Sequence, residues 1–227
     1  MKKFLTILII CISFVGFSQQ TDTLPKNKIN LGVSFSPDYN YRAIKAGGAD
    51  AWMKELYDTL EVPKFGYSFG ANLFFNINER FFIGTGVFFV DRGEKTKKYN
   101  VEPVSNYSNH YYFLEIPAKA QYYLLAGKVK FFISAGFSAN IFLGGHSTVK
   151  PSGYSGAGDP VVYRASKNTS RLGLSTVLGL GLDCPVSQRW YIRLEPTFKR
   201  AITPLADGLL KRYFYSGGFN IGLFYRL

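Results

Sequence analysis

Thirteen residues decide the fold of this chain, the stretch YFLEIPAKAQYYL from Tyr112 to Leu124. Every second side chain from Tyr112 onward is aromatic or aliphatic, whereas the positions between them include Glu115, Lys119 and Gln121. Side chains that alternate with a period of two point to opposite faces of a sheet, so the stretch predicts a β-strand. Strands in soluble proteins usually have about five or six residues. A tilted strand that crosses a bilayer needs about nine to eleven, which fits this length better.

The same alternation recurs near the C-terminus. Within residues 190–199, the charged residues Arg193, Glu195 and Lys199 share one face, and the other face is apolar. Within residues 213–227, tyrosines stand at both ends of the apolar face, as the aromatic girdles of a membrane barrel require. An Arg or Lys that faces lipid at the bilayer midplane costs about 2–4 kcal/mol. The charged faces are therefore expected to point into a barrel.

The N-terminus has the pattern of a secretory signal peptide. Lys2 and Lys3 precede an apolar run over residues 4–17, which is too short for a membrane-spanning helix of about 20 residues. Small residues around Ser18 place the expected cleavage directly after it. We therefore expect residues 1–18 to be removed on export.

The rest of the chain is expected to form a short lead over residues 19–27 and one barrel domain over residues 28–227. The composition of the full chain fits, because a mean hydropathy of −0.01 and 17% aromatic residues are typical of strands with one polar and one apolar face. The net charge of +12 favours contact with anionic lipid head groups. No nucleic-acid motif accompanies this charge, so nucleic acid is not an expected partner.

Eight segments of the chain predict strands. They lie at residues 28–38, 64–77, 80–91, 110–125, 128–143, 171–184, 189–200 and 212–227. The third of them is apolar on both faces, which leaves its register open. Long connections (39–63, 92–109, 144–170 and 201–211) alternate with short turns, as in outer-membrane barrels with short periplasmic turns and longer outer loops. We expect an all-β fold, an eight-stranded antiparallel up-and-down transmembrane β-barrel that is integral to the outer membrane.

Two features stand apart from this scheme. Residues 43–60 contain Trp52 and Leu56 at helical spacing, which predicts a short amphipathic helix that packs as a lid. A helix that binds a partner is the alternative. Pro117 and Pro196 fall inside expected strands, where each lacks an N–H group for the ladder. We expect a β-bulge at each proline.

The stretch FLEIPAKAQYY over residues 113–123 resembles the signature strand of the PorT-like outer membrane protein beta-barrel domain family of Gram-negative bacteria, also called porin family proteins. The glycine-rich segment 178–183 and the closing segment 220–223 are similar to that family as well. This resemblance implies an eight-stranded outer-membrane barrel. For some members it also implies an accessory role in protein export across the outer membrane. The chain ends in Arg226 and Leu227 rather than in the terminal phenylalanine common in such barrels.

The interior of an eight-stranded barrel is just wide enough for side chains to fill it. Charged groups buried there must be paired. The expected lumen charge network consists of Glu115, Lys119, Asp183, Arg193, Glu195, Lys199 and Arg226. We expect this network to plug the lumen, and a narrow channel for ions or small solutes is the alternative.

We expect no catalytic residue, metal ion or cofactor. Carboxylates such as Glu115 need a substrate within hydrogen-bond reach to act as general acids or bases, and a sealed lumen offers none. A third hypothesis is a lipid A-modifying enzyme, because Ser108 precedes His110 and Ser147 follows His146 at the outer strand ends. The simpler interpretation of both histidines is a location on the surface.

The expected outer loops carry most of the excess positive charge, and Arg and Lys bind phosphate strongly. The expected lipopolysaccharide contacts are Arg92, Lys95, Lys97, Lys98, Arg200, Lys211 and Arg212. A solvated charged surface without a ligand is the alternative. Taken together, the sequence predicts a monomer that is not an enzyme and that surrounds itself with outer-membrane lipid. Its expected role is structural or accessory: membrane integrity, surface adhesion, or assistance to a secretion or surface-protein complex.

Overall fold

The computed structural model describes residues 29–97, 106–150, 152–153, 156–157, 159–164, 170–206 and 210–227. The expected signal peptide and the lead that follows it lie outside these described residues.

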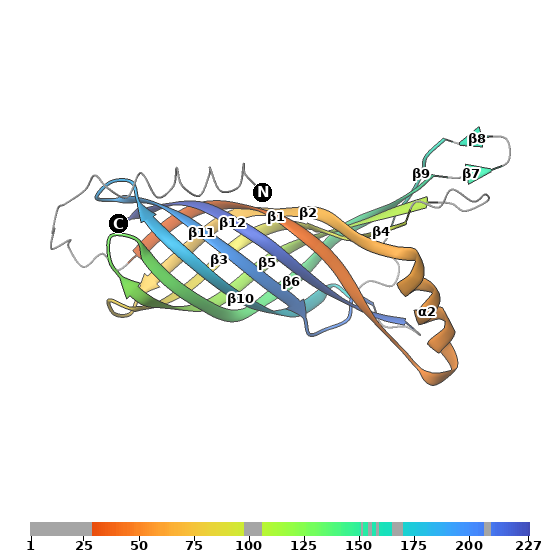
Figure 1. The fold of residues 1–227 in the computed structure, drawn as a ribbon, viewed down its shortest axis with the longest axis horizontal. Coiled ribbons are helices and arrows are strands. Elements are labelled where there is room, and N and C mark those ends of the chain that lie inside the picture. The colour runs from red at the N-terminus through yellow and green to blue at the C-terminus, as the bar shows by residue number, and fades with distance from the viewer. Residues whose placement is uncertain are drawn as a thin grey trace, which may run out of the picture.

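Within these ranges, eight long strands close into one antiparallel ring (Figure 1). Each strand pairs with the next along the chain, and the last pairs with the first. The strands are β1 (Ile29–Ala46), β2 (Glu61–Asn76), β3 (Phe81–Arg92), β5 (Asn106–Ala126), β6 (Lys130–Lys150), β10 (Leu172–Pro185), β11 (Trp190–Ala201) and β12 (Leu210–Arg226). The closed ring has no edge strand, so the backbone groups of the ring find partners without water. This is the predicted eight-stranded barrel.

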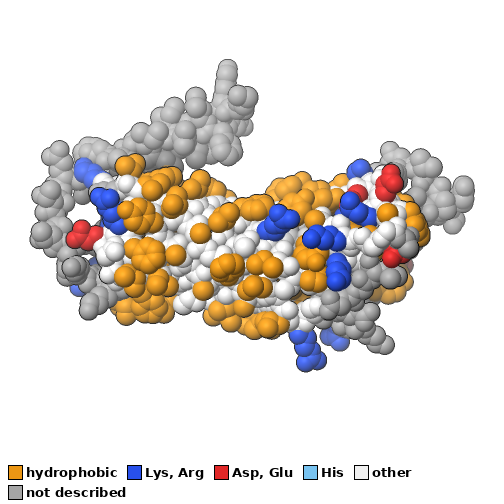
Figure 2. Space-filling model, turned by 90° about the horizontal axis from the view of Figure 1, so that it is seen from below, with side chains coloured by type: hydrophobic (Ala, Val, Ile, Leu, Met, Phe, Trp, Pro, Cys, Tyr) orange, Lys and Arg blue, Asp and Glu red, His pale blue; other side chains and the backbone are white. Residues whose placement is uncertain are grey.

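The two faces of the strands differ in polarity as the alternation predicted. On the outer wall, Val33 is 63% exposed and Leu178 is 54% exposed. Inside, Glu195 and Arg193 are 0% and 1% exposed. Figure 2 shows apolar side chains spread along one side of the barrel wall. β3, whose register the sequence left open, turns Phe88 inward.

Aromatic side chains mark both ends of the apolar wall. At the outer end, the ring of Phe89 lies 6.3 Å from that of Tyr67 and 5.6 Å from that of Tyr112. At the end that holds the short turns, the rings of Trp190 and Tyr225 lie 4.9 Å apart. Such girdles sit at the level of the lipid head groups. They delimit the membrane-spanning part of the strands.

Several strands continue beyond the outer girdle, where the long connections were predicted. β1 runs to Ala46, β5 begins at Asn106 and β6 runs to Lys150. The prediction that residues 39–63, 92–109 and 144–170 are loops is therefore wrong in part. These extensions lie outside the lipid, so they need no apolar face. In β1 the buried and exposed positions still alternate, with Asn40, Arg42 and Ile44 buried.

Short elements complete the outer end (Figure 1). β4 (Glu94–Thr96) pairs with β2 and β5, and β9 (Val161–Arg164) extends the sheet beside β6. A small hairpin joins β7 (Ser152–Gly153) to β8 (Gly156–Ala157).

The predicted helix is present but does not pack as a lid. A 3-10 turn, η2 (Gly48–Asp50), leads into α2 (Ala51–Leu60), which connects β1 to β2. Trp52 is 64% exposed and Leu56 is 47% exposed, so the apolar face of α2 points away from the barrel. No helix among the described residues is long and apolar enough to span a membrane.

Pro117 and Pro196 are accommodated without the expected bulges. β3 and β5 keep one register from the pair Thr85–Ala118 to the pair Phe88–Glu115, on either side of Pro117. The β10–β11 register is likewise unchanged across Pro196. The ladder on the other side of each strand continues through the proline, because Pro117 still pairs with Ser138 and Pro196 with Phe219. Each proline lacks one N–H group, but the neighbouring strands on both sides keep the register of its strand unchanged.

The outer wall yields a direct test of the membrane-spanning band. Ile221 lies on the apolar face of β12 between Tyr213 and Tyr225, and Val186 lies in a short turn; both are exposed. We expect Ile221→Arg to lower the free energy of unfolding in lipid vesicles by about 2–4 kcal/mol, because lipid cannot solvate the charge. Val186→Arg, in contact with water, is the matched control and is expected to change little. If both variants lose the same free energy of unfolding, Ile221 does not lie in the membrane-spanning band.

Candidate functional site

The interior of the barrel holds stacked layers of paired charges. In the layer nearest the short turns, the Arg193 guanidinium donates from Nε to Asp183 Oδ1 (2.7 Å) and from Nη2 to Asp183 Oδ2 (2.8 Å). Its third nitrogen, Nη1, donates to Gln121 Oε1 at 2.9 Å, and the Tyr123 hydroxyl donates to Asp183. A bidentate pair of this kind is strong and fixes the orientation of both groups.

Aromatic rings enclose this Arg193 guanidinium. Its central carbon lies 4.4 Å from the ring centre of Phe132, 4.5 Å from that of Phe74 and 4.9 Å from that of Phe224. A cation over aromatic faces is stabilised by about 2 kcal/mol or more when water is excluded. The three phenylalanines lie on the polar parity of their strands and are at most 1% exposed. This aromatic cage closes the periplasmic end of the lumen around one cation.

The next layer is centred on Glu195. Its carboxylate accepts from Lys119 Nζ at 3.0 and 3.1 Å and from Ser134 Oγ at 2.6 Å. Asn220, its direct neighbour on β12, adds a longer contact of 3.4 Å. Ionised carboxylates that are this buried persist only when such partners surround them.

Glu115 carries the third layer and binds two cations. Lys199 Nζ donates to it at 2.8 Å, and Arg92 forms a second buried ion pair with it. A cavity of about 30 Å³ lies between Glu115 and Lys119, with room for about two water molecules. The lumen at this level is therefore filled.

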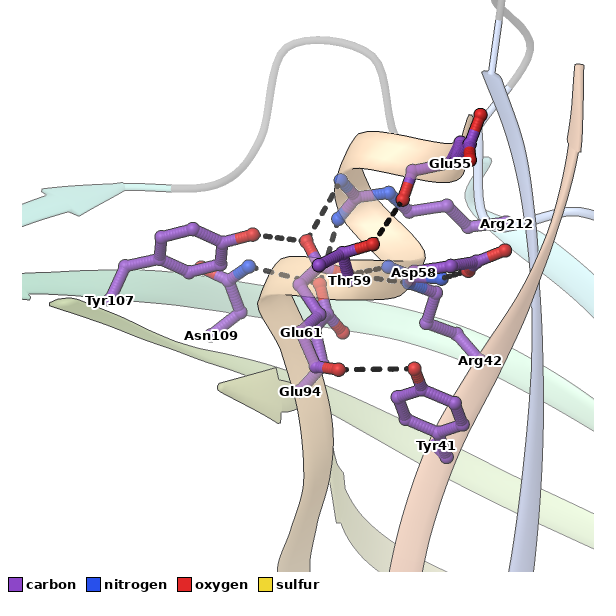
Figure 3. A network of polar contacts seen from close by, with 10 residues as sticks. All are labelled: Tyr41, Arg42, Glu55, Asp58, Thr59, Glu61, Glu94, Tyr107, Asn109 and Arg212. Atoms are coloured by element: carbon purple, nitrogen blue, oxygen red, sulfur yellow. Dashed lines mark hydrogen bonds and ion pairs between the residues drawn. The ribbon is translucent and has the colours of Figure 1, made fainter. Parts of the chain in front are cut away.

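A larger polar network occupies the outer mouth, beyond the girdle (Figure 3). Glu61, at the end of α2, accepts from Arg42 and from the Tyr107 hydroxyl. Arg42 also pairs with Asp58 of α2 at 2.6 Å, so the network anchors the helix to β1.

Glu94 forms the other half of the same network. It accepts from Asn109 at 2.9 Å and from Arg212 at 2.7 Å, and Arg212 reaches Glu61 as well. Burial raises the pKa of Glu94 above its ordinary value, and the neighbouring Arg212 opposes this rise. The sequence did not reveal this network, because its members other than Arg212 lie where loops were predicted. The continued alternation of Asp38, Asn40 and Arg42 was the available signal.

The structure brings six of the seven predicted lumen residues together inside the barrel: Glu115, Lys119, Asp183, Arg193, Glu195 and Lys199. Asp183 and Arg193 are direct neighbours on β10 and β11, whereas Lys119–Glu195 and Glu115–Lys199 join β5 to β11 across the barrel. The seventh, Arg226, lies at the periplasmic end over the ring of Tyr191 and donates to the carbonyl of Gln188 at 3.4 Å. Arg226 has no ion pair with the other six in the described part of the chain.

The predicted lipopolysaccharide contacts divide into two groups. Arg92 and Arg212 point into the barrel and pair with glutamates, so the expectation that they contact lipopolysaccharide is wrong. The inward parity of β3 and β12 at these positions is the reason. The four exposed cations of the set are Lys95, Lys97, Arg200 and Lys211. Lys98 lies outside the described residues.

The two histidines lie next to each other on adjacent strands. His110 of β5 pairs in register with His146 of β6, and its Nδ1 contacts Asp91 at 2.9 Å. Neither ring is hydrogen-bonded to Ser108 or Ser147 in the part of the chain that the structure describes. The serine–histidine pairs of the enzyme hypothesis are thus not formed.

The Arg193–Asp183 pair predicts a stability test. We expect Arg193→Met to lower the free energy of unfolding by about 3–5 kcal/mol, because Asp183 is left buried without its partner. Adding Asp183→Asn to that variant should recover part of the loss, since no unpaired charge remains. Urea titrations in lipid vesicles measure both. A double variant less stable than the single one would contradict the pairing.

The backbone is similar to those of several solved outer-membrane barrels. They include Neisserial surface protein A (14% identity, TM-score 0.49, 88% of this chain and 97% of that chain covered), Ail of Yersinia pestis (14%, 0.42, 89% and 100%) and OprG of Pseudomonas aeruginosa (13%, 0.47, 89% and 97%). No curated protein matches the sequence. The family described as "Outer membrane protein beta-barrel domain" matches residues 14–207. The chain therefore belongs to this family of integral outer-membrane β-barrel proteins.

Proposed function

We propose that this protein is a structural or accessory barrel with a closed lumen, and not a diffusion channel or an enzyme. The observation that carries the proposal is the stack of ion pairs across the interior, from the Arg193 cage to the Glu94–Arg212 network. Each layer spans the lumen with side chains from facing strands. Moving an ion through them would require separating buried charges, which costs several kcal/mol.

Planar-bilayer recording tests the closed lumen. Folded wild-type monomer is expected to give no stable nanosiemens channels. The triple variant Lys119→Ala, Arg193→Ala, Glu195→Ala removes two layers and is expected to conduct. The control is Lys45→Ala, on the outer wall, which should stay silent. Stable large channels from the wild type would support the channel hypothesis instead.

We also propose that the outer wall of the barrel binds lipopolysaccharide phosphates through Arg200 and Lys211 of the predicted set and through Lys45, which was not predicted. Lys45 of β1 and Lys211 of β12 are exposed and lie directly opposite each other in register. Like charges at such positions repel unless an anion lies between them. The Lys45 ammonium lies 5.1 Å from the ring centre of Tyr213, at the girdle level. Figure 2 shows Lys and Arg side chains gathered on the part of the wall nearer the outer end.

Charge removal at this collar has a matched control. The triple variant Lys45→Gln, Arg200→Gln, Lys211→Gln is expected to raise the detergent sensitivity of cells that depend on this protein, because phosphate contacts are lost. The triple variant Arg80→Gln, Lys128→Gln, Arg189→Gln removes the same charge from exposed positions near the short turns. It should leave sensitivity unchanged. If both variants act alike, net charge rather than the collar is responsible.

An accessory role in a secretion or surface-protein complex, as in PorT-like proteins, is the finer part of the proposal. The exposed Trp52 and Leu56 on α2 support it, since an apolar helix face outside the lipid offers a contact for another protein. Cross-linking from position 52 in intact cells, followed by identification of the attached proteins, tests this part. Attachment to lipid alone would count against it.

A further inference from the structure

The two histidines of the chain form a cross-strand pair at the outer rim. His110 and His146 are directly opposite in the β5–β6 register, and their rings stack with centres 4.7 Å apart and planes 10° from parallel. The pair lies just beyond Tyr112 of the outer girdle, and the His110 side chain is 27% exposed. The rings are thus on the water side of the membrane interface and accessible.

In each of the two rings, Nδ1 is the nitrogen that contacts a neighbouring oxygen. His110 Nδ1 lies 2.9 and 3.1 Å from the carboxylate oxygens of Asp91, which is 4% exposed. His146 Nδ1 lies 3.4 Å from the Tyr112 hydroxyl. In the described residues neither Nε2 atom has a hydrogen bond. Histidines that bind metals characteristically give their second nitrogen to a carboxylate or another oxygen in this way.

We propose that His110 and His146 bind one divalent transition-metal ion, such as Zn²⁺, Ni²⁺ or Cu²⁺, through their Nε2 atoms. Imidazole nitrogen suits these ions, with a metal–nitrogen distance of about 2.0–2.1 Å for zinc. The rings must rotate out of their stack to bind one ion, because the in-plane lone pairs of parallel rings do not converge. No group of three or more His, Cys, Asp and Glu side chains is placed to hold a metal among the described residues. Water or an external ligand therefore completes the coordination.

The neighbouring groups set the strength of the site. Burial and the adjacent His110 lower the pKa of His146. Lys64 opposes the ion, because its Nζ lies 2.6 Å from His110 Nδ1. Burial lowers the pKa of Lys64 to about 8, and its other acceptor, the Asn109 carbonyl, is 3.2 Å away. A metal ion on Nε2 leaves the proton of His110 on Nδ1. Nδ1 then donates to Asp91, and the Lys64 ammonium, which is also a donor, must move away from it.

Titration calorimetry on protein without a histidine tag, folded in detergent, tests the site with zinc, nickel or copper salts. A Cys184→Ser background removes the thiol as a competing ligand. The expected stoichiometry is one ion per chain. His110→Gln and His146→Gln should each weaken binding about tenfold or more, and Asp91→Asn by about 10- to 100-fold. Lys64→Gln should tighten binding, because it removes a positive charge beside the ion.

The variants distinguish a built site from adventitious binding. Each is first shown to fold by its heat-modifiable migration in gels. Loss of binding in Asp91→Asn together with a gain in Lys64→Gln identifies the two opposed neighbours, which an accidental surface site would not show. The proposal is overturned if the double variant His110→Gln, His146→Gln still binds one ion, or if the wild type shows no saturable binding at millimolar metal.

Discussion

Hydrocarbon around the barrel is the constraint on which the structure depends. Lipid cannot solvate a charge or an unpaired backbone group, so the strands close into a ring and every charge within the membrane span turns inward. Inside, the space is too narrow for bulk water, and a buried carboxylate needs polar partners. Asp183 finds its cation on the neighbouring strand, whereas Glu195 and Glu115 find theirs across the barrel, which ties its walls together.

The same constraint explains why the outer end looks different. Past the girdle at Tyr112, water replaces lipid, and the strands no longer need one apolar face. Polar groups there face either side, and the Glu61–Arg42 network joins α2 to the mouth. The exposed helix face, the cationic collar and the histidine pair all lie in this region. We expect this protein to contact any partner at its outer end, because the side chains of the lumen and of the lipid-facing wall stabilise the fold.

Sequence reasoning succeeded where the solvent imposed a pattern. The period of two across Glu115 and Lys119 predicted both the strand and its inward face, because lipid penalises the reverse orientation. It did not identify the partners, since Lys119 meets Glu195, which is 76 residues away. It placed Arg92 and Arg212 outside, because Arg92 was assigned to a loop and Arg212 to the outermost position of a strand. It also expected bulges at Pro117 and Pro196, where neighbouring ladders hold the register instead.

The sequence by itself determined the class of the molecule: an exported chain whose alternating strands suit a barrel in lipid. That information is local, because alternation depends only on which side chains neighbour each other along one strand. The tertiary structure alone decided which charges pair, that rings of Phe74, Phe132 and Phe224 surround Arg193, and that His110 meets His146. Those contacts depend on strand register and on the tilt of the closed ring, and both arise only when all eight strands pair.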